Sequence, residues 1–396
     1  MDPISTIKIL ESKNTFKDYS YQFLPKSLSY LSKSEKIKFN TFNLKTSYLI
    51  DIMHNLLLKF YFTKNNSIEL ASKILKKKYG QYYSHYMNYL IQNEYIFLIK
   101  DYFKGEHSKT YSISSKIISS EISRYQNYNK FLLRKINNKV FQNTSSNKLI
   151  TSAIKDKLID DLYHVDINIE KSYKFIESLK KDNIDSYNKN KFSIDSIDNK
   201  NIFYHFDNYG RVHTNFTILK GFIRKNYLLI DNEPVCEIDI SNSQPLFLSN
   251  LIKYSDTKWV DKDEYELFRE LVVNGCYYDY LIDNLSLKDR KSAKDLTYKV
   301  FFGQNRNNSK SDKMFIKLFP TIHNYIVLYK KDFHDYRILA QHLQRFESDI
   351  IFNKIVSKIM ILNPSIRIIT IHDSLIVQER WREAVSKIFY DEISNC

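Results

Sequence analysis

Two short apolar strands that each end in an acid constrain the fold of this chain most strongly. The run 236–239 ends in Asp239 and a polar turn, and the β-branched run 366–371 closes on His372 and Asp373 before apolar residues resume. A carboxylate at the end of a buried strand is costly unless it is paired or binds a metal ion. A single aspartate there is most often a helix cap, whereas two in one domain favour a shared metal site.

A basic helix is predicted between these two acids, over residues 290–303. Its basic and aromatic side chains recur every four residues, so they form one stripe on the helix. The members of this stripe are Arg290, Lys294, Tyr298 and Phe302. An amphipathic helix with a solvated basic end and a buried aromatic end is the alternative, but it leaves the flanking acids unexplained.

The composition indicates a globular protein with a polyanionic partner. A chain of 396 residues with 43% hydrophobic and 15% aromatic content has room for two or three packed domains. The formal net charge of +15 predicts attraction to polyanions, of which nucleic acid is the commonest. Codon bias in an AT-rich genome is the alternative source of the lysines, because Gly and Pro number only 6 each.

The three cysteines, Cys236, Cys276 and Cys396, are too few and too scattered for a disulfide framework or a zinc site, which favours a reducing compartment. The first eleven residues lack the pattern of a signal peptide, and no apolar run is long enough to cross a membrane. We therefore expect an intracellular, cytoplasmic protein with no membrane partner.

The segment 44–115 has the pattern of a small DNA-binding fold. Residues 44–62, 68–77 and 82–92 show helical spacing, and the β-rich runs 95–102 and 109–113 are joined by a polar loop. Three helices and a hairpin resemble winged-helix domains, in which the third helix enters the major groove and the hairpin touches the backbone. This resemblance implies DNA contacts for Ser84, His85, Asn88, Gln92, Lys104 and Lys109. A protein-binding winged helix with a solvated polar face is the alternative.

The order of motifs in residues 207–377 resembles the family A polymerases, which include DNA polymerase I and, more distantly, the single-subunit RNA polymerases of phages and mitochondria. Asp239 falls at the first metal-binding aspartate, in a version of the Asp-x-Ser motif, and Asp373 at the second, after the family's histidine. The stretch 290–294 resembles the start of the fingers helix. Residues 207–211 resemble the Gly-Arg element near the primer end, and 344–351 resemble a palm helix.

The resemblance implies an α+β fold with a right-hand polymerase palm built on an antiparallel sheet, helical fingers and a thumb-like region. It implies two Mg²⁺ ions, with Mn²⁺ as a substitute, held by Asp239, Asp373 and the backbone of Ile240. The implied nucleotide-binding residues are Gln244, Arg290, Lys294, Tyr298, Phe302 and Gly303. The implied primer and template contacts are Arg211, Gln344 and His372. Asp349 is expected to be a structural polar residue.

Three residues depart from the pattern of the family's DNA polymerases. Gln244 stands where a Glu usually blocks the ribose 2′-hydroxyl, Phe302 where a Tyr is usual, and Ser374 where a Glu follows the second aspartate. Glutamine keeps the length of that Glu but loses its charge and its purely accepting character. The choice between deoxyribose and ribose therefore stays open.

These patterns predict four regions: an irregular arm over 1–43, the winged helix over 44–115, a helical thumb or connector over 116–205, and the palm and fingers over 206–396. Within the third region, 182–201 reads as a surface loop or linker. The expected function is DNA-directed DNA synthesis for a plasmid or phage, using dNTPs on a primer-template. The alternatives are an RNA polymerase or primase of the same fold, and a DNA-binding replication initiator or regulator with a degenerate polymerase domain.

Overall fold

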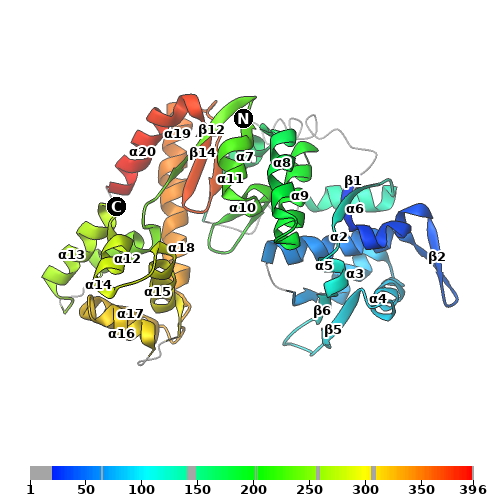
Figure 1. Ribbon diagram of the computed structural model, residues 1–396, viewed down its shortest axis with the longest axis horizontal. Coiled ribbons are helices and arrows are strands. Elements are labelled where there is room, and N and C mark those ends of the chain that lie inside the picture. The colour runs from blue at the N-terminus through cyan, green and yellow to red at the C-terminus, as the bar shows by residue number, and fades with distance from the viewer. Residues whose placement is uncertain are drawn as a thin grey trace. The chain divides into compact units, whose positions relative to one another are not determined.

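The computed structural model describes residues 20–63, 66–140, 149–200, 202, 204–255, 259–304 and 309–394. It combines α-helices with antiparallel sheets, which confirms the α+β class (Figure 1). The chain divides into two compact units. The N-terminal unit comprises Met1–Thr144, Asp166–Phe203 and Thr214–Leu228, and the C-terminal unit comprises Ser145–Val165, Tyr204–His213 and Leu229–Cys396.

The N-terminal unit begins with structure that the sequence did not predict. Its first elements are β1 (Ser20–Pro25), the 3₁₀ helix η1 (Lys26–Lys33), β2 (Lys36–Phe39) and β3 (Phe42–Lys45). Strand β1 pairs with β7 (Ile122–Asn127), and Phe23 and Leu24 are buried. The expectation of an irregular arm is therefore wrong from Ser20 onward, because a distant strand completes the pairing of β1. Residues 1–19 lie outside the described residues.

The winged-helix pattern is largely present. Its elements are α2 (Thr46–Thr63), β4 (Ile68–Leu70), α3 (Ser72–Tyr79), α4 (Tyr83–Gln92), β5 (Ile96–Lys100) and β6 (Lys109–Ile113). The predicted first and third helices and the hairpin are confirmed, and the sheet order is β4-β6-β5. The second helix begins later than predicted, because Ile68 is buried in a strand and pairs with Tyr111 of β6.

Further helices complete the N-terminal unit, and one of them corrects the sequence interpretation. They are α5 (Ser115–Ile118), α6 (Lys130–Val140), α8 (Ile169–Leu179), α9 (Ile184–Asp198), α10 (Asn215–Ile218) and α11 (Gly221–Tyr227). Helix α9 occupies the segment expected to be a linker, so that expectation is wrong. Two of its buried polar residues have distant partners: Asn188 Oδ1 accepts from the Ile122 amide at 3.1 Å, and Asp195 accepts from the Tyr173 hydroxyl. Segments of the predicted 116–205 region belong to both units.

The C-terminal unit is built on an antiparallel sheet. Its strands β13 (Ile369–Ile371), β14 (Ser374–Gln378), β12 (Glu233–Asp239) and β11 (Leu228–Ile230) lie in the order β13-β14-β12-β11, and β8 (Val165–Ile167) follows β11 in the sheet. The short strands β9 (Tyr204–Phe206) and β10 (Val212–Thr214) form a separate pair. Ile238, Leu375 and Val377 are buried against the surrounding helices. This sheet positions the candidate site.

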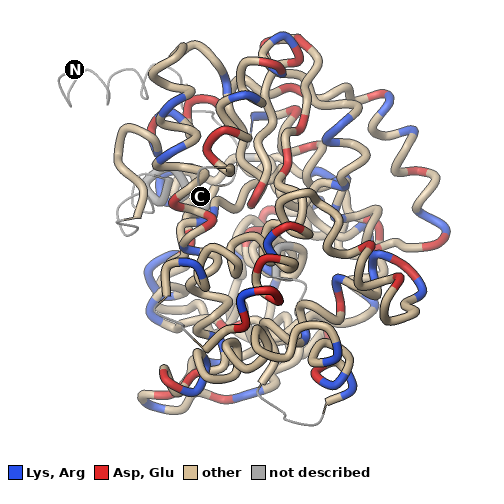
Figure 2. The backbone as a smooth tube through the Cα atoms, turned by 90° about the vertical axis from the view of Figure 1, so that its left-hand side faces the viewer, with Lys and Arg blue, Asp and Glu red and all other residues tan. Residues whose placement is uncertain are grey.

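The helices of the C-terminal unit are α7 (Ser152–Leu162), α12 (Ser243–Lys253), α13 (Lys262–Val273), α14 (Tyr277–Leu285), α15 (Arg290–Phe302), α16 (Lys310–Ile316), α17 (Pro320–Asp332), α18 (Ile338–Ser348), the π-helical segment η2 (Asp349–Val356), α19 (Ser357–Leu362), the 3₁₀ turn η3 (Glu379–Trp381) and α20 (Arg382–Ser394). Basic and acidic residues are interspersed along the described chain (Figure 2). None of the described helices has both the length and the apolar character needed to cross a bilayer.

Candidate active site

Strand pairing brings the two predicted acids together. Asp239, the last residue of β12, lies opposite Ser374, the first residue of β14, so Asp373 is one register position away on the neighbouring strand. Adjacent strands lie about 4.8 Å apart. Asp239 is exposed and Asp373 is half-buried. The two acids therefore occupy the same end of the sheet, on neighbouring strands.

Tight turns fix the backbone beside each acid. His372, immediately before Asp373, has φ 54°, and Asn242, in the turn after Asp239, has φ 57°. Residues other than glycine rarely adopt this left-handed conformation, and the backbone strain that it causes is often found at functional sites. The Ser374 hydroxyl donates to the Ile371 carbonyl at 3.1 Å across the first turn. The His372 ring lies 5.8 Å from that of His213.

The donor set at the end of the sheet fits Mg²⁺. Mg²⁺ commonly binds proteins through one or two carboxylates, and water and substrate phosphates supply its other ligands. Asp239 and Asp373 provide that pair, and the backbone of Ile240 follows directly at the strand end. Within the described ranges, no cluster of three or more His, Cys, Asp or Glu side chains could hold a metal ion.

Helix α15 presents the predicted stripe on one face. Arg290, Lys294 and Tyr298 are exposed, and Phe302 is half-buried with its ring 5.4 Å from that of Tyr298. The opposite face packs into the core through Ala293, Leu296, Thr297, Val300 and Phe301. The spacing in the sequence therefore predicted the orientation of this helix correctly.

Tyr278 of α14 holds the two cations of α15, and sequence reasoning missed it. Its ring is 5.1 Å from the guanidinium carbon of Arg290 and 5.6 Å from Lys294 Nζ, within the range of cation–π attraction. Arg290 Nη2 also donates to Asn242 Oδ1 at 3.4 Å, in the turn after Asp239. These contacts place the basic end of α15 beside the acids. Nothing in the sequence of α14 signals this role.

The end of helix α15 requires a glycine at position 303. A Cβ atom on Gly303 would lie 2.3 Å from the Lys299 carbonyl oxygen, so a larger residue does not fit. Lys330 of α17 donates from Nζ to the carbonyl oxygens of Val300 and Gly303 at 2.8 and 2.9 Å. Burial lowers the pKa of Lys330 to about 8. This buried lysine caps the C-terminus of the helix.

The Gly-Arg element packs closely on α18. Asp207 Oδ1 accepts from the backbone amides of Tyr209 and Arg211, at 2.9 and 3.0 Å, and this shapes the turn. Gly210 has φ 92°, and a Cβ atom there would lie 2.8 Å from Ser348 Cβ. A glycine is therefore required by both the backbone conformation and the close approach.

A buried carboxylate, Glu347 of α18, links two predicted site residues. It accepts from Arg211 Nε and Nη2 at 2.9 and 2.8 Å, and from Gln244 Nε2 at 2.7 Å. Burial, and to a smaller extent the charge of Asp373, raises the pKa of Glu347 to about 7 against the opposing effect of Arg211. Burial also raises the pKa of Tyr298, as does Asp373. Glu347 and Tyr298 therefore both lie within electrostatic range of Asp373. Sequence reasoning missed Glu347.

Gln344 and Asp349 belong to the segment 344–351. Gln344 is half-buried on α18, one turn before Glu347. Asp349 is exposed and accepts from Asn353 Nδ2 at 2.8 Å, one turn further along the helix. This contact agrees with a structural role for Asp349.

The predicted DNA contacts of the winged helix lie on α4 and the hairpin. Ser84, Asn88 and Gln92 are exposed at four-residue spacing, so they share one face. His85 is instead half-buried, and its ring stacks on Phe42 at 3.6 Å. In the hairpin, Lys104 is exposed, and Lys109 pairs with Asp101 at 3.1 Å.

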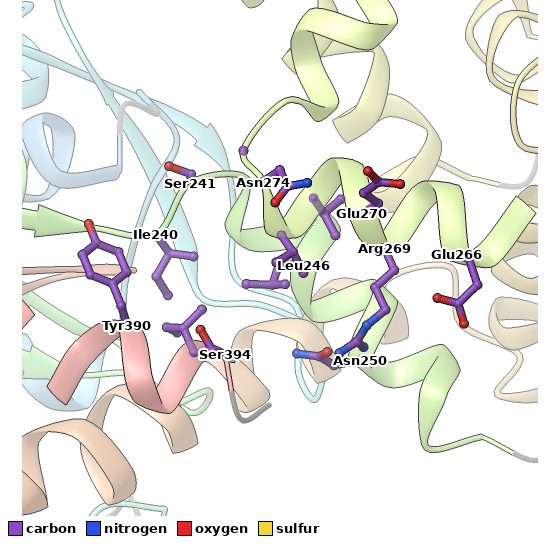
Figure 3. A pocket seen from close by; sticks show the side chains of 14 residues that line it. Ile240, Ser241, Leu246, Asn250, Glu266, Arg269, Glu270, Asn274, Tyr390 and Ser394 are labelled. Atoms are coloured by element: carbon purple, nitrogen blue, oxygen red, sulfur yellow. The ribbon is translucent and has the colours of Figure 1, made fainter. Parts of the chain in front are cut away.

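A pocket of about 460 Å³ lies next to the strand-end acid but involves other side chains (Figure 3). Ile240 and Ser241 line it, together with Asn250 of α12, Arg269 of α13 and Tyr390 of α20. Successive side chains of a strand point to opposite faces, so Ile240 points away from the side of Asp239. The side chains of Asp239, Asp373 and the α15 stripe do not line this pocket.

No protein-family model matches the chain, and no curated protein matches its sequence.

Proposed function

We propose that this protein is a template-directed nucleotidyltransferase that extends a primer on a DNA template with the help of two Mg²⁺ ions. The observation that carries the proposal is the pairing of β12 with β14, which puts Asp239 beside Asp373. The exposed cations of α15 lie next to the same strand end through the contact of Arg290 with Asn242. Acids for metal ions and cations for a triphosphate thus meet in one site.

Each residue of the site has a distinct task in this reaction. Asp239 and Asp373 hold the metal ions, which stabilise charge on the attacking and leaving oxygens of the phosphoryl transfer. Arg290 binds triphosphate oxygens through its planar guanidinium, and Lys294 acts as a point charge. Tyr298 and Phe302 stack on the same face of α15, and we assign them to the base and sugar of the nucleotide. Arg211, Gln344 and His372 are assigned to the primer end by the motif resemblance.

Two features support DNA as the partner. The net charge of +15 attracts a polyanion. The exposed stripe Ser84, Asn88 and Gln92 on α4 has the length and spacing of a helix face that docks in a major groove. Binding through α4 would hold the DNA, and the C-terminal unit would perform the chemistry.

Primer extension by wild type and by Asp373→Asn tests the proposal. The variant should lose at least about a thousandfold in rate, because one carboxylate of the metal pair becomes neutral. The control is Asp391→Asn, the same chemical change at an exposed position of α20. The assay uses defined DNA and RNA primer-templates, with dNTPs and rNTPs in separate reactions. One lane contains no primer.

Equal activity in wild type and Asp373→Asn would refute the metal assignment. A footprint on a specific DNA sequence, with no incorporation on any template, would instead support a replication initiator whose polymerase-like unit is degenerate.

A further inference from the structure

An open hollow of about 490 Å³ lies on the sheet formed by β1 and β7 in the N-terminal unit, whereas the candidate active site belongs to the C-terminal unit. Three of its six lining residues are tyrosines, one is an arginine, and none of the six is acidic. The lining residues of this β1–β7 hollow are Tyr21 of β1, Ser32 of η1, Arg124, Tyr125 and Gln126 of β7, and Tyr128, which follows β7. The proposed nucleotidyl transfer does not use this surface.

Hydrogen bonds hold the side chains of the β1–β7 hollow in place. Gln126 lies opposite Tyr21 in the pairing of the two strands, and its Nε2 donates to the Tyr21 hydroxyl at 3.2 Å. The Tyr128 hydroxyl donates to Gln126 Oε1 at 2.6 Å. One amide therefore links the two rings through their hydroxyl groups. Because these side chains are already ordered, a ligand that contacts their rings loses less entropy on binding.

Arg124 adds a flat cation to this surface. Its guanidinium carbon lies 4.9 Å from the centre of the Tyr21 ring, which is a cation–π contact. Its side chain is still 41% exposed, and its distance of 3.9 Å to Asp198 is long for an ion pair. Tyr128 is 59% exposed. Both an aromatic ring and a guanidinium plane are thus open to a ligand in the same hollow.

Exposed aromatic rings beside an arginine are the groups that bind unpaired nucleobases. Every base has a π-face that stacks on an aromatic ring or on a guanidinium plane, and each such contact contributes about 1–3 kcal/mol. In a duplex these faces are covered by the neighbouring bases, so a duplex does not use the hollow in this way. Proline-rich peptides also bind grooves lined by aromatic residues. The net charge of +15 favours the polyanion over such a peptide.

We propose that the β1–β7 hollow is a binding site for a single-stranded nucleic acid, in which the ring of Tyr128 and the guanidinium of Arg124 stack on unpaired bases. This site goes beyond the proposed function, because it concerns binding alone and needs neither metal ions nor nucleotides. It gives the N-terminal unit a surface for single strands in addition to the face of α4 that we assign to duplex DNA.

Titration of the full-length protein into a fluorescently labelled oligothymidylate of about 15 nucleotides tests the proposal. Tyr128→Ala should weaken binding about tenfold, because one stacking contact is lost. Tyr128→Phe keeps the ring and loses only the hydrogen bond to Gln126, so it should bind as wild type does. Tyr390→Ala is the matched control, the same change at an exposed tyrosine of the C-terminal unit, and it should keep the wild-type affinity.

Arg124→Lys separates stacking from charge. Lysine keeps the positive charge but has no plane to stack on a base, so the affinity for oligothymidylate should fall about fivefold. Wild-type affinity in this variant would refute stacking by the guanidinium of Arg124.

Three further probes identify the ligand: an oligouridylate of the same length, a DNA duplex and an oligoproline peptide. The oligouridylate shows whether RNA or DNA is preferred, and dependence of either single strand on Tyr128 supports the site. Unchanged binding of both single strands in Tyr128→Ala, or an equal loss of affinity for the duplex, would overturn the proposal. Binding of the peptide that depends on Tyr128, with no such dependence for either single strand, would assign the hollow to a protein partner instead.

The two proposals fail independently. A protein that extends primers, but whose binding of single strands does not depend on Tyr128, keeps the proposed function and loses this site. A protein that incorporates no nucleotide, but binds single strands through Tyr128, keeps this site and loses the proposed function.

Discussion

At the scale of single residues, the arrangement of charge depends on side chains outside every motif. Arg290 and Lys294 share the ring of Tyr278, which is buried and comes from the preceding helix. Arg211 and Gln244 share the carboxylate of Glu347. The charged groups therefore keep their positions through contacts with buried partners, and this preorganisation is what a phosphoryl-transfer site needs.

Lys294→Met should raise the KM for the nucleotide about tenfold, because an ammonium group that would bind the triphosphate is lost. Steady-state primer extension at varied nucleotide concentration measures the effect. Lys291→Met is the matched control, since Lys291 is exposed at the same end of α15 but lies outside the stripe. The same KM in both variants would contradict the role given to Lys294.

Glu347 should make the stability of the protein depend on pH. Its pKa in the folded protein is raised from 4.5 to about 7, so between these values the folded state binds more protons than the unfolded state. The free energy of unfolding must then fall as pH rises through this window. The contribution of Glu347 to the free energy of unfolding is measured as the value for wild type minus the value for Glu347→Gln. This difference should fall by about 3 kcal/mol between pH 4.5 and pH 7. Denaturant unfolding at several pH values checks this, and a rising or flat difference would contradict it.

At the scale of the elements, the end of α15 is fixed by α17. Lys330 donates to two carbonyl oxygens in the last turn of α15, while Gly303 provides the space for the chain to leave the helix. The stripe on α15 was predictable, because four-residue spacing is a local property of a helix. The cap on the C-terminus of α15 was not predictable. Lys330 comes from another helix, and nothing in the sequence distinguishes it from a surface lysine.

Lys330→Met should lower the free energy of unfolding by about 1–3 kcal/mol, since it leaves buried carbonyl groups without a donor. Chemical denaturation measures the change. Lys331→Met at the adjacent, exposed position should be close to wild type, so equal destabilisation by the two changes would show that the cap has no energetic importance.

At the scale of the whole molecule, the described residues form two units that each use several separate segments of the chain. The predicted boundaries after residues 43, 115 and 205 assumed continuous domains, whereas each of these units joins separate segments of the chain. Strands such as β1 and β7 pair across about a hundred residues of sequence, and such pairing has no local signal.

DNA binding by the whole protein should weaken steeply with salt, because lysines and arginines release counterions from the phosphates. With about six phosphate contacts, the binding constant for duplex DNA should fall about a thousandfold between 50 and 200 mM monovalent salt. A filter-binding or fluorescence titration at several salt concentrations gives the slope. An affinity that does not change with salt would contradict an electrostatic DNA interface.

Features that depend on near neighbours were predictable from the sequence: the acid at the end of each strand, the stripe on α15, and the helices and hairpin of the winged-helix segment. Three features needed the folded structure: the pairing that brings Asp239 next to Asp373, the contacts of Tyr278 and Glu347 with charged groups, and the burial of helix α9. The physical reason is that buried polar groups are stable only with partners. For Glu347 and Asn188 those partners come from distant parts of the chain.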